Sequence, residues 1–224
     1  DTLMAISSIK NGVKAAETGF LVSDREKIYP YRCLAGFYLN IGREEMAYRY
    51  FQKAYEKSKI YNVGWDLETD IITNLANYHR DKGEIKTALK LYQTAIDKAF
   101  YDTTIFASGG LFCDEIELIE ILNNKGFALL QLYEKQDKNL KHLKDALSCQ
   151  ESAIQLIEKR LGYLDNESSE YNWLAIVQTT YNNAVLYSTL LYNLTTDKCY
   201  GEAGYKFAEK SRMVIILMAS RDKK

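Results

Sequence analysis

Two segments of this chain read LAGFYLNIGREEMAYRYFQKAYEK (residues 34–57) and LANYHRDKGEIKTALKLYQTAIDK (residues 75–98), and they repeat one pattern of small, aromatic and glycine residues. Matching residues are 41 positions apart throughout. The pairs are Leu34 and Leu75, Ala35 and Ala76, Gly42 and Gly83, Ala47 and Ala88, Phe51 and Tyr92, Gln52 and Gln93, and Ala54 and Ala95. An internal repeat of this length predicts stacked helical hairpins.

The small and glycine positions tell which part of each hairpin they occupy. Alanine recurs where two helix axes must approach closely, and large apolar residues fill the spaces between. Gly42 and Gly83 stand where the first helix ends, because glycine accepts the left-handed conformation common at helix C-termini. Each segment is therefore predicted to form a helix, a tight turn and a returning helix.

This pattern resembles the tetratricopeptide repeat, a helix-turn-helix solenoid unit. The family's period is about 34 residues, so a spacing of 41 implies longer helices or a longer connection between repeats. One departure is His79, which stands where Tyr38 fills the large apolar position of the first repeat. The resemblance implies an all-α fold in which antiparallel helix-turn-helix repeats stack as a right-handed superhelix.

Composition agrees with an all-α class, because one proline and 12 glycines in 224 residues leave few helix breakers. We predict about nine helices. They are expected near 2–18, 27–41, 43–60, 66–82, 84–100, 113–136, 139–160, 168–194 and 199–220. A break at ASGGLF (107–112) divides an N-terminal helix and two regular hairpins (1–106) from a continuation of the same solenoid with two longer, irregular helix pairs (107–224).

Several function classes are disfavoured by the residue inventory. The 29 Lys and Arg nearly balance the 30 Asp and Glu, so no basic footprint for nucleic acid exists. The four cysteines form no C-x-x-C pair, which argues against zinc or redox sites. The two histidines, His79 and His142, stand in no catalytic spacing with cysteine or carboxylate. We expect no enzyme activity, no cofactor and no metal.

The second half resembles a narrower group. A long-looped hairpin, a Tyr-rich helix and the sequence FAEKSR (207–212) are similar to the repeat region that precedes a caspase-like CHAT protease domain in bacterial proteins. The resemblance covers residues 29–220 and implies a regulatory, partner-binding region of a larger protease. The alternatives are the sensor region of a bacterial histidine kinase or transcription regulator, and a free-standing adaptor.

The chain ends on an apolar run, Met213–Ala219, that is far shorter than the roughly 20 residues needed to cross a bilayer. A membrane span is therefore not expected, and the run should be covered by protein. We expect it to dock a downstream domain or another subunit. The docking candidates are Met213, Val214, Ile216 and Leu217.

Binding residues follow from the resemblance, in which the first helix of each pair lines a concave groove for a protein or peptide partner. The candidates are Arg32, Leu39, Asn40, Thr73, Asn77, Arg80 and Asp81. A clamp for a peptide carboxylate is rejected, because Glu120 would present a like charge where the clamp needs a cation.

The sequence opens DTLMAISS, without an initiator methionine or a signal peptide, and we expect it to be a fragment of a longer protein. Its scattered cysteines are those of a reducing compartment. We therefore expect a cytoplasmic location.

Overall fold

The computed structural model describes five stretches of backbone. They are residues 2–18, 23–61, 63–106, 115–161 and 170–221, without the side chains at 2, 3, 5, 100–106, 170–172 and 217–221. These stretches form nine α-helices and one turn of π-helix, with no strand among them. The chain divides into two compact units, Asp1–Cys113 and Asp114–Lys224, which are described separately.

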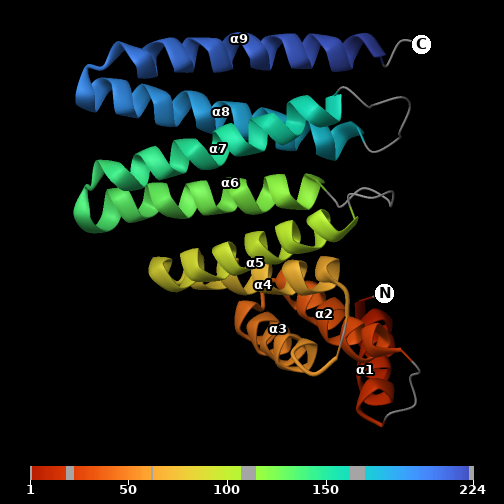
Figure 1. The fold of residues 1–224 in the computed structure, drawn as a ribbon. Coiled ribbons are helices and arrows are strands. Elements are labelled where there is room, and N and C mark those ends of the chain that lie inside the picture. Colours follow the sequence, from red (N-terminus) through yellow and green to blue (C-terminus); the bar gives the residue numbers. More distant parts are fainter. Residues whose placement is uncertain (1, 19–22, 62, 107–114, 162–169, 222–224) are drawn as a thin grey trace. The chain divides into compact units, whose positions relative to one another are not determined.

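The first unit contains five helices, each packed on the next in chain order (Figure 1). They are α1 (Thr2–Glu17), α2 (Asp24–Asn40), α3 (Glu44–Ser58), α4 (Trp65–Asp81) and α5 (Ile85–Phe106). The pairs α2 with α3 and α4 with α5 are the two hairpins that the 41-residue repeat predicts. The all-α prediction is confirmed, and the helix boundaries agree within a few residues at most ends.

One helix start was placed too late. α2 begins at Asp24 because Ser23 and Glu26 form a capping box: the Glu26 amide donates to Ser23 Oγ at 3.2 Å, and the Ser23 amide donates to Glu26 Oε2 at 2.9 Å. Pro30 consequently lies inside the helix and not in its first turn. The predicted start at residue 27 overlooked the S-x-x-E box.

Both hairpin turns have the predicted glycine conformation. Gly42 and Gly83 adopt positive φ angles of 71° and 82°. The backbone hydrogen bonds also repeat: the Gly42 amide donates to the Leu39 carbonyl, and the Gly83 amide donates to the Arg80 carbonyl, each at 2.9 Å. An added Cβ would meet nothing within 4 Å at either glycine, so φ alone accounts for glycine at both turns.

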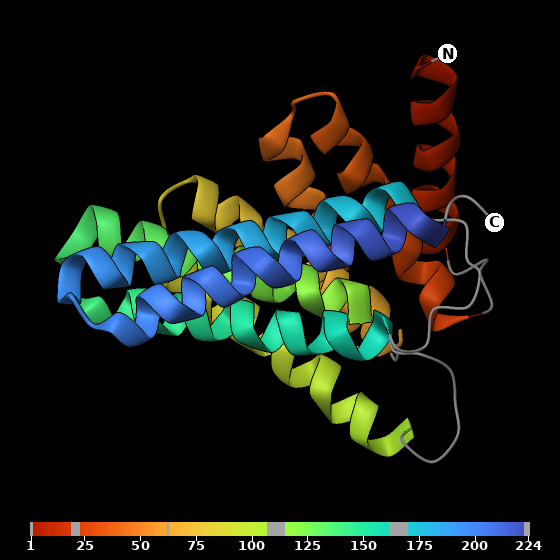
Figure 2. The ribbon, with the colours of Figure 1, turned by 90° about the horizontal axis from the view of Figure 1, so that it is seen from above.

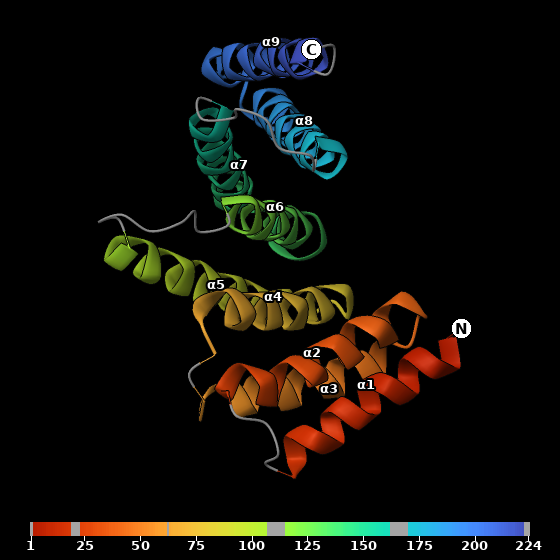
Figure 3. The same cartoon turned by 90° about the vertical axis from the view of Figure 1, so that its right-hand side faces the viewer.

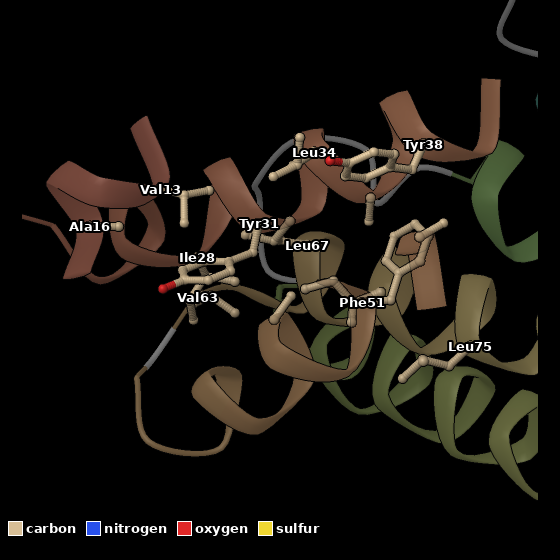
Figure 4. Close-up of a cluster of buried hydrophobic side chains, with 14 residues drawn as sticks. Val13, Ala16, Ile28, Tyr31, Leu34, Tyr38, Phe51, Val63, Leu67 and Leu75 are labelled. Atoms are coloured by element: carbon tan, nitrogen blue, oxygen red, sulfur yellow. The ribbon is translucent and has the colours of Figure 1, made fainter. Parts of the chain in front are cut away.

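The core of the first unit lies between α1, α2, α3 and α4 (Figure 4). Its centre is apolar and fully enclosed, with Ile28, Leu34 and Ile71 at 0% exposure. Tyr31 is 1% exposed, and its hydroxyl donates to Glu17 Oε1 at 3.0 Å, which ties α2 to α1. The alanines of the repeat pattern are buried as predicted, including Ala35, Ala47 and Ala54 at 0%.

The second unit contains four long helices and the π-helical turn. They are α6 (Glu115–Leu132), η1 (Tyr133–Asp137), α7 (Leu140–Leu161), α8 (Glu170–Thr195) and α9 (Lys198–Arg221). Consecutive helices pack together, and α6 also contacts α8. In Figure 3, α7 lies to one side of α6 and α8, and α9 lies across α8 at the end of the unit. The unit is thus two hairpins stacked in the same sense.

These two hairpins repeat at an offset of 58 residues, which the sequence comparison did not find. The left-handed residues at their turns are Lys138, with φ 51°, and Thr196, with φ 58°. Asn139 Oδ1 accepts the Lys141 amide at 3.0 Å, and 58 residues later Asp197 Oδ1 accepts the Cys199 amide at 3.0 Å. The same hydrogen-bond geometry at one offset, from an asparagine in one turn and an aspartate in the other, indicates that α6–α7 and α8–α9 are versions of one hairpin.

A glutamine occupies the core of the α6–α7 hairpin. Gln150 is 0% exposed, and neither of its amide atoms has a hydrogen-bond partner within the described part of the chain. Its Nε2 lies 2.4 Å from the position that a Cβ on Gly126 would take, so the amide rests directly on the glycine backbone. Glycine at 126 therefore makes room for a polar side chain in an apolar layer.

Replacing Gln150 with methionine should stabilise the protein. The change keeps the length of the side chain and removes two buried, unpaired polar atoms, so the free energy of unfolding should rise by about 1 kcal/mol. Urea unfolding followed by circular dichroism measures it. Gln155→Met, at an exposed position of the same helix, is the control and should change stability by less than about 0.5 kcal/mol. A loss of stability in Gln150→Met would show that the amide is satisfied.

Candidate partner-binding surfaces

The seven groove candidates lie on two helices of the first unit. Arg32, Leu39 and Asn40 belong to α2, and the other four belong to α4. Both are the first helix of their hairpin, as predicted. The structure joins the two helices by ion pairs, so several candidate side chains already have partners inside the unit.

Arg32 is paired with a carboxylate of α4. Its Nε and Nη2 donate to the two oxygens of Asp70 at 2.7 and 3.0 Å, and these hydrogen bonds raise the pKa of the guanidinium. Asp70 also accepts from Asn74 Nδ2 at 3.3 Å. Arg32 thus links α2 to α4 and is not an open anion-binding group, because two of its nitrogens already donate to both oxygens of a carboxylate.

A second bidentate pair connects the same helices near their N-termini. Arg25 Nη1 and Nη2 donate to Asp66 Oδ1 and Oδ2 at 2.8 and 2.6 Å, and Arg25 Nη1 also reaches the Val63 carbonyl at 3.2 Å. Hydrogen bonding from Arg25 lowers the pKa of the Asp66 carboxyl. Arg25 and Asp66 are 41 residues apart, so they occupy the same position in successive repeats.

Two candidates on α4, Asn77 and Arg80, bond to a buried hydroxyl. Tyr92 of α5 is 0% exposed, and its hydroxyl donates to Asn77 Oδ1 at 2.5 Å. Arg80 Nη1 donates to the same two groups, at 3.2 Å to Asn77 Oδ1 and 3.2 Å to the Tyr92 oxygen. Arg80 Nε donates to Asp81 Oδ1 at 2.9 Å. Asn77 and Arg80 therefore support the α4–α5 hairpin as well as facing its surface.

The first repeat lacks this polar cluster, and the difference between the two repeats explains it. Phe51 stands where Tyr92 stands in the second repeat, and Gly36 and Leu39 stand where Asn77 and Arg80 stand. The repeat without a buried hydroxyl has no polar groups to meet one. Residue choice at the two surface positions thus follows from the residue beneath them.

Leu39 and Asn40 remain as exposed candidates. Leu39 is 40% exposed, and an added Cβ on nearby Gly36 would meet nothing within 4 Å. Thr73 differs, because its hydroxyl oxygen is buried and has no hydrogen-bond partner in the described residues. The α2 surface around Gly36 is therefore the more accessible part of the proposed groove.

The docking candidates on α9 do not share one environment. Val214 is buried, with 9% exposure, whereas Met213 and Ile216 are 69% and 68% exposed. Val214 therefore faces its own unit and is not available for docking in this conformation. The side chain of Leu217 lies outside the described residues.

Sequence reasoning missed the groups that link the helices. Tyr48 of α3 stacks on Tyr78 of α4 with centroids 4.0 Å apart, and Tyr78 donates to Glu45 at 2.7 Å. Lys82 lies 3.4 Å from Glu45, and together these groups lower the pKa of the Glu45 carboxyl. Of all these links, only the Arg25–Asp66 pair left a sequence signal, namely opposite charges at the repeat offset.

Two further properties concern the stretches that the structure describes. In these stretches no helix has an apolar segment of the length needed to span a bilayer. In the same stretches, no three His, Cys, Asp or Glu side chains are grouped so that they could hold a metal ion. His79 Nδ1 and His142 Nε2 each contact a carboxylate, Glu84 at 2.6 Å and Asp137 at 3.0 Å.

Comparison with known proteins places the fold. No family model matches the chain, and no curated protein matches it in sequence. The chain is similar to crystal structures of a kinesin light chain-like protein from Podosopora anserina with nearly identical TPR-like repeats. For one, the TM-score is 0.56 at 13% identity over 94% of this chain and 88% of that chain. For a single-substitution variant of that protein, the TM-score is 0.57 at 13% identity, over 100% of this chain and 89% of that chain. At this identity the likeness concerns the fold, which is TPR-like.

Removing or adding the buried hydroxyl tests the contrast between repeats. Tyr92→Phe should lower the free energy of unfolding by about 1 kcal/mol, because Asn77 and Arg80 lose a partner. Phe51→Tyr should lower it by about 1 to 3 kcal/mol, because the new hydroxyl is buried without one. Both are measured by urea unfolding. Phe51→Tyr at full stability would refute the link between buried and surface residues.

Acidification tests the Arg25–Asp66 pair. Because the folded-state pKa of Asp66 lies below its unfolded value, the pair stabilises the protein above pH about 4 and loses this effect as pH falls through the folded pKa. Asp66→Asn should therefore destabilise the protein at pH 7, and the deficit should shrink toward pH 3. Urea unfolding across this range measures it.

The matched control replaces the other partner. In an Arg25→Met background, Asp66→Asn should change stability by an amount that no longer depends on pH in this window. A deficit that stays constant from pH 7 to pH 3 in the native background would contradict the role of the charge pair.

Proposed function

We propose that this chain is a protein-interaction scaffold whose first-helix surface, on α2 and α4, receives a protein or peptide partner. The observation that carries the proposal is the repetition of the hairpin, down to the turn hydrogen bonds, in a fold similar to TPR-like repeat proteins. Stacked hairpins expose a long surface made of successive equivalent helices, which suits the binding of extended or helical partners.

The charge arrangement supports recognition by shape and apolar contact. Arg25 and Arg32 are paired with Asp66 and Asp70, so this surface does not present a strong field of either sign. Leu39 is exposed beside the open space at Gly36. A partner that inserts an apolar side chain there would gain burial without displacing an ion pair.

At a finer level, we propose that the chain is the regulatory region of a larger bacterial, cytoplasmic CHAT protease. The support is the resemblance of residues 29–220 to the repeat regions that precede such domains. The exposed Met213 and Ile216 on the last helix would then contact the catalytic domain or another subunit. In this role the segment itself is a binding module without catalytic activity.

A free-standing adaptor is the second candidate. Part of the apolar run is covered internally, because Val214 is buried within its own chain. The burial of Val214 leaves less apolar surface for a docking domain to bury. The sensor region of a histidine kinase or transcription regulator is a further alternative, distinguished by the domain found beyond Lys224.

A crosslinking experiment in the native cells tests the binding surface. A photoreactive residue at Leu39 or Asn40 should crosslink one and the same protein, whereas the reagent at Gln52, exposed on α3, should not. Leu39→Ala should then weaken binding of that purified partner about tenfold in calorimetry. Equal crosslinking at Gln52, or unchanged affinity of Leu39→Ala, would refute the assignment.

The same cells distinguish the finer proposals. The intact mass of the parent protein, with sequencing of the peptides beyond Lys224, should reveal a domain of a few hundred residues with a reactive Cys and His pair. A kinase or DNA-binding domain in its place would support the sensor alternative, and a mass near that of this chain would support the adaptor.

A further inference from the structure

The 58-residue repeat of the second unit identifies a helix face that is covered in one hairpin and open in the other. α7 packs against two α-helices, α6 and α8, whereas α9 packs mainly against α8 and is joined to α7 by the Lys210–Glu158 ion pair at 2.6 Å. Positions that are buried on α7 and exposed on α9 are therefore those that a following helix covers. Figure 2 shows α8 and α9 lying alongside each other, with α9 on the outside.

Two positions meet this description clearly. Leu147 and Ile154 of α7 are 5% and 3% exposed, and 58 residues later stand Tyr205, 68% exposed, and Arg212, with a 74% exposed side chain. The helical spacing of 205, 212 and 216 places Ile216 on the same stripe. We call Tyr205, Arg212 and Ile216 the outer stripe of α9.

The exposed side of α9, which carries the outer stripe, is complementary to itself in charge when two copies of α9 run antiparallel. Glu202 lies exposed near its N-terminal end and Arg212 toward its C-terminal end, so a twofold axis between them brings the acid of one copy to the base of the other. Arg212 pairs with Glu209 of its own helix at 2.9 Å, and both side chains are exposed. The intermolecular pair would therefore extend an existing one.

The same register places one large apolar side chain against a glycine. With Glu202 opposite Arg212, Met213 of one copy falls opposite Gly201 of the other, and Ile216 falls opposite Lys198. The ring of Tyr192 lies 3.4 Å from the position of a Cβ on Gly201 and is 42% exposed. Met213 of one copy would therefore meet a glycine and an exposed ring in the other.

We propose that α9 is the contact helix of a symmetric dimer of this chain, in which the α9 of a second copy covers the outer stripe as α8 covers α7. The occupant is a second copy because a twofold contact requires a surface complementary to itself, and α9 satisfies that requirement in charge, with Glu202 against Arg212, and in size, with Gly201 against Met213. This inference rests on the proposed docking role of the last helix and is independent of partner binding at α2 and α4.

Sedimentation equilibrium of the chain over about a hundredfold range of concentration tests the dimer. The native protein should associate to a dimer and no further, because a twofold contact closes on itself. Glu202→Arg and Arg212→Glu should each weaken the dimer about tenfold or more, since each places like charges opposite one another.

The double variant Glu202→Arg with Arg212→Glu decides between a specific contact and general stickiness. It restores opposite charges across the twofold axis and should regain native dimer affinity. Arg49→Glu, exposed on α3, is the matched control for charge reversal and should leave the dimer unchanged. Circular dichroism verifies that each variant is folded.

Three results would overturn the proposal. They are a native protein that stays monomeric throughout the range, single variants that dimerise like the native protein, and a double variant that dimerises no better than the singles. None of these results bears on the crosslinking at Leu39, so the dimer and the scaffold function fail or stand separately.

Discussion

Close approach of two helices at a residue with little or no side chain is the constraint on which each hairpin depends. Ala35, Ala76 and Ala184 have no exposed surface, and Gly126 is buried at the corresponding place. A larger side chain at these points would push the helix axes apart and open the layers on either side. The turns and the stacking of the hairpins depend on this distance between helix axes. This explains why alanine or glycine recurs at these positions in all four hairpins, although other residues of the repeat differ.

The position facing the close contact shows how much the pattern tolerates. It is Phe51 in the first hairpin, Tyr92 in the second, Gln150 in the third and Ala208 in the fourth. The residue at this position determines which neighbours fit around it. The Tyr92 hydroxyl donates to Asn77, and the Gln150 amide lies against Gly126. Core residues therefore determine some surface residues, and a polar residue on the outer face of a repeat helix is not by itself evidence of a binding site.

The all-α class and the first two hairpins could be predicted because their signals are local and repeated: glycine at a left-handed turn, alanine at a crossing, and one offset throughout. The start of α2 was misplaced because the Ser23–Glu26 capping box was overlooked. The 58-residue repeat was missed because it preserves burial and turn geometry more than residue identity. Side-chain pairing on the groove was beyond reach, since Arg32–Asp70 joins residues whose spacing differs from the repeat. The burial of Val214 likewise depends on how α9 rotates against α8.

A stack of hairpins has two end helices, and each must either carry a polar outer face or be covered. At the start of the first unit, α1 covers α2, burying Val13 and Ala16 and placing Gly12 against Pro30. At the end of the second unit, α9 retains tyrosine, methionine and isoleucine on its outer side among charged residues. Burying such apolar side chains is favourable, but scattered apolar side chains are also common on protein surfaces. The stability of the unit therefore does not require another chain or domain to bury them. Stability alone does not explain the order of residues along this helix, in which Glu202 and Arg212, and Gly201 and Met213, stand in complementary positions.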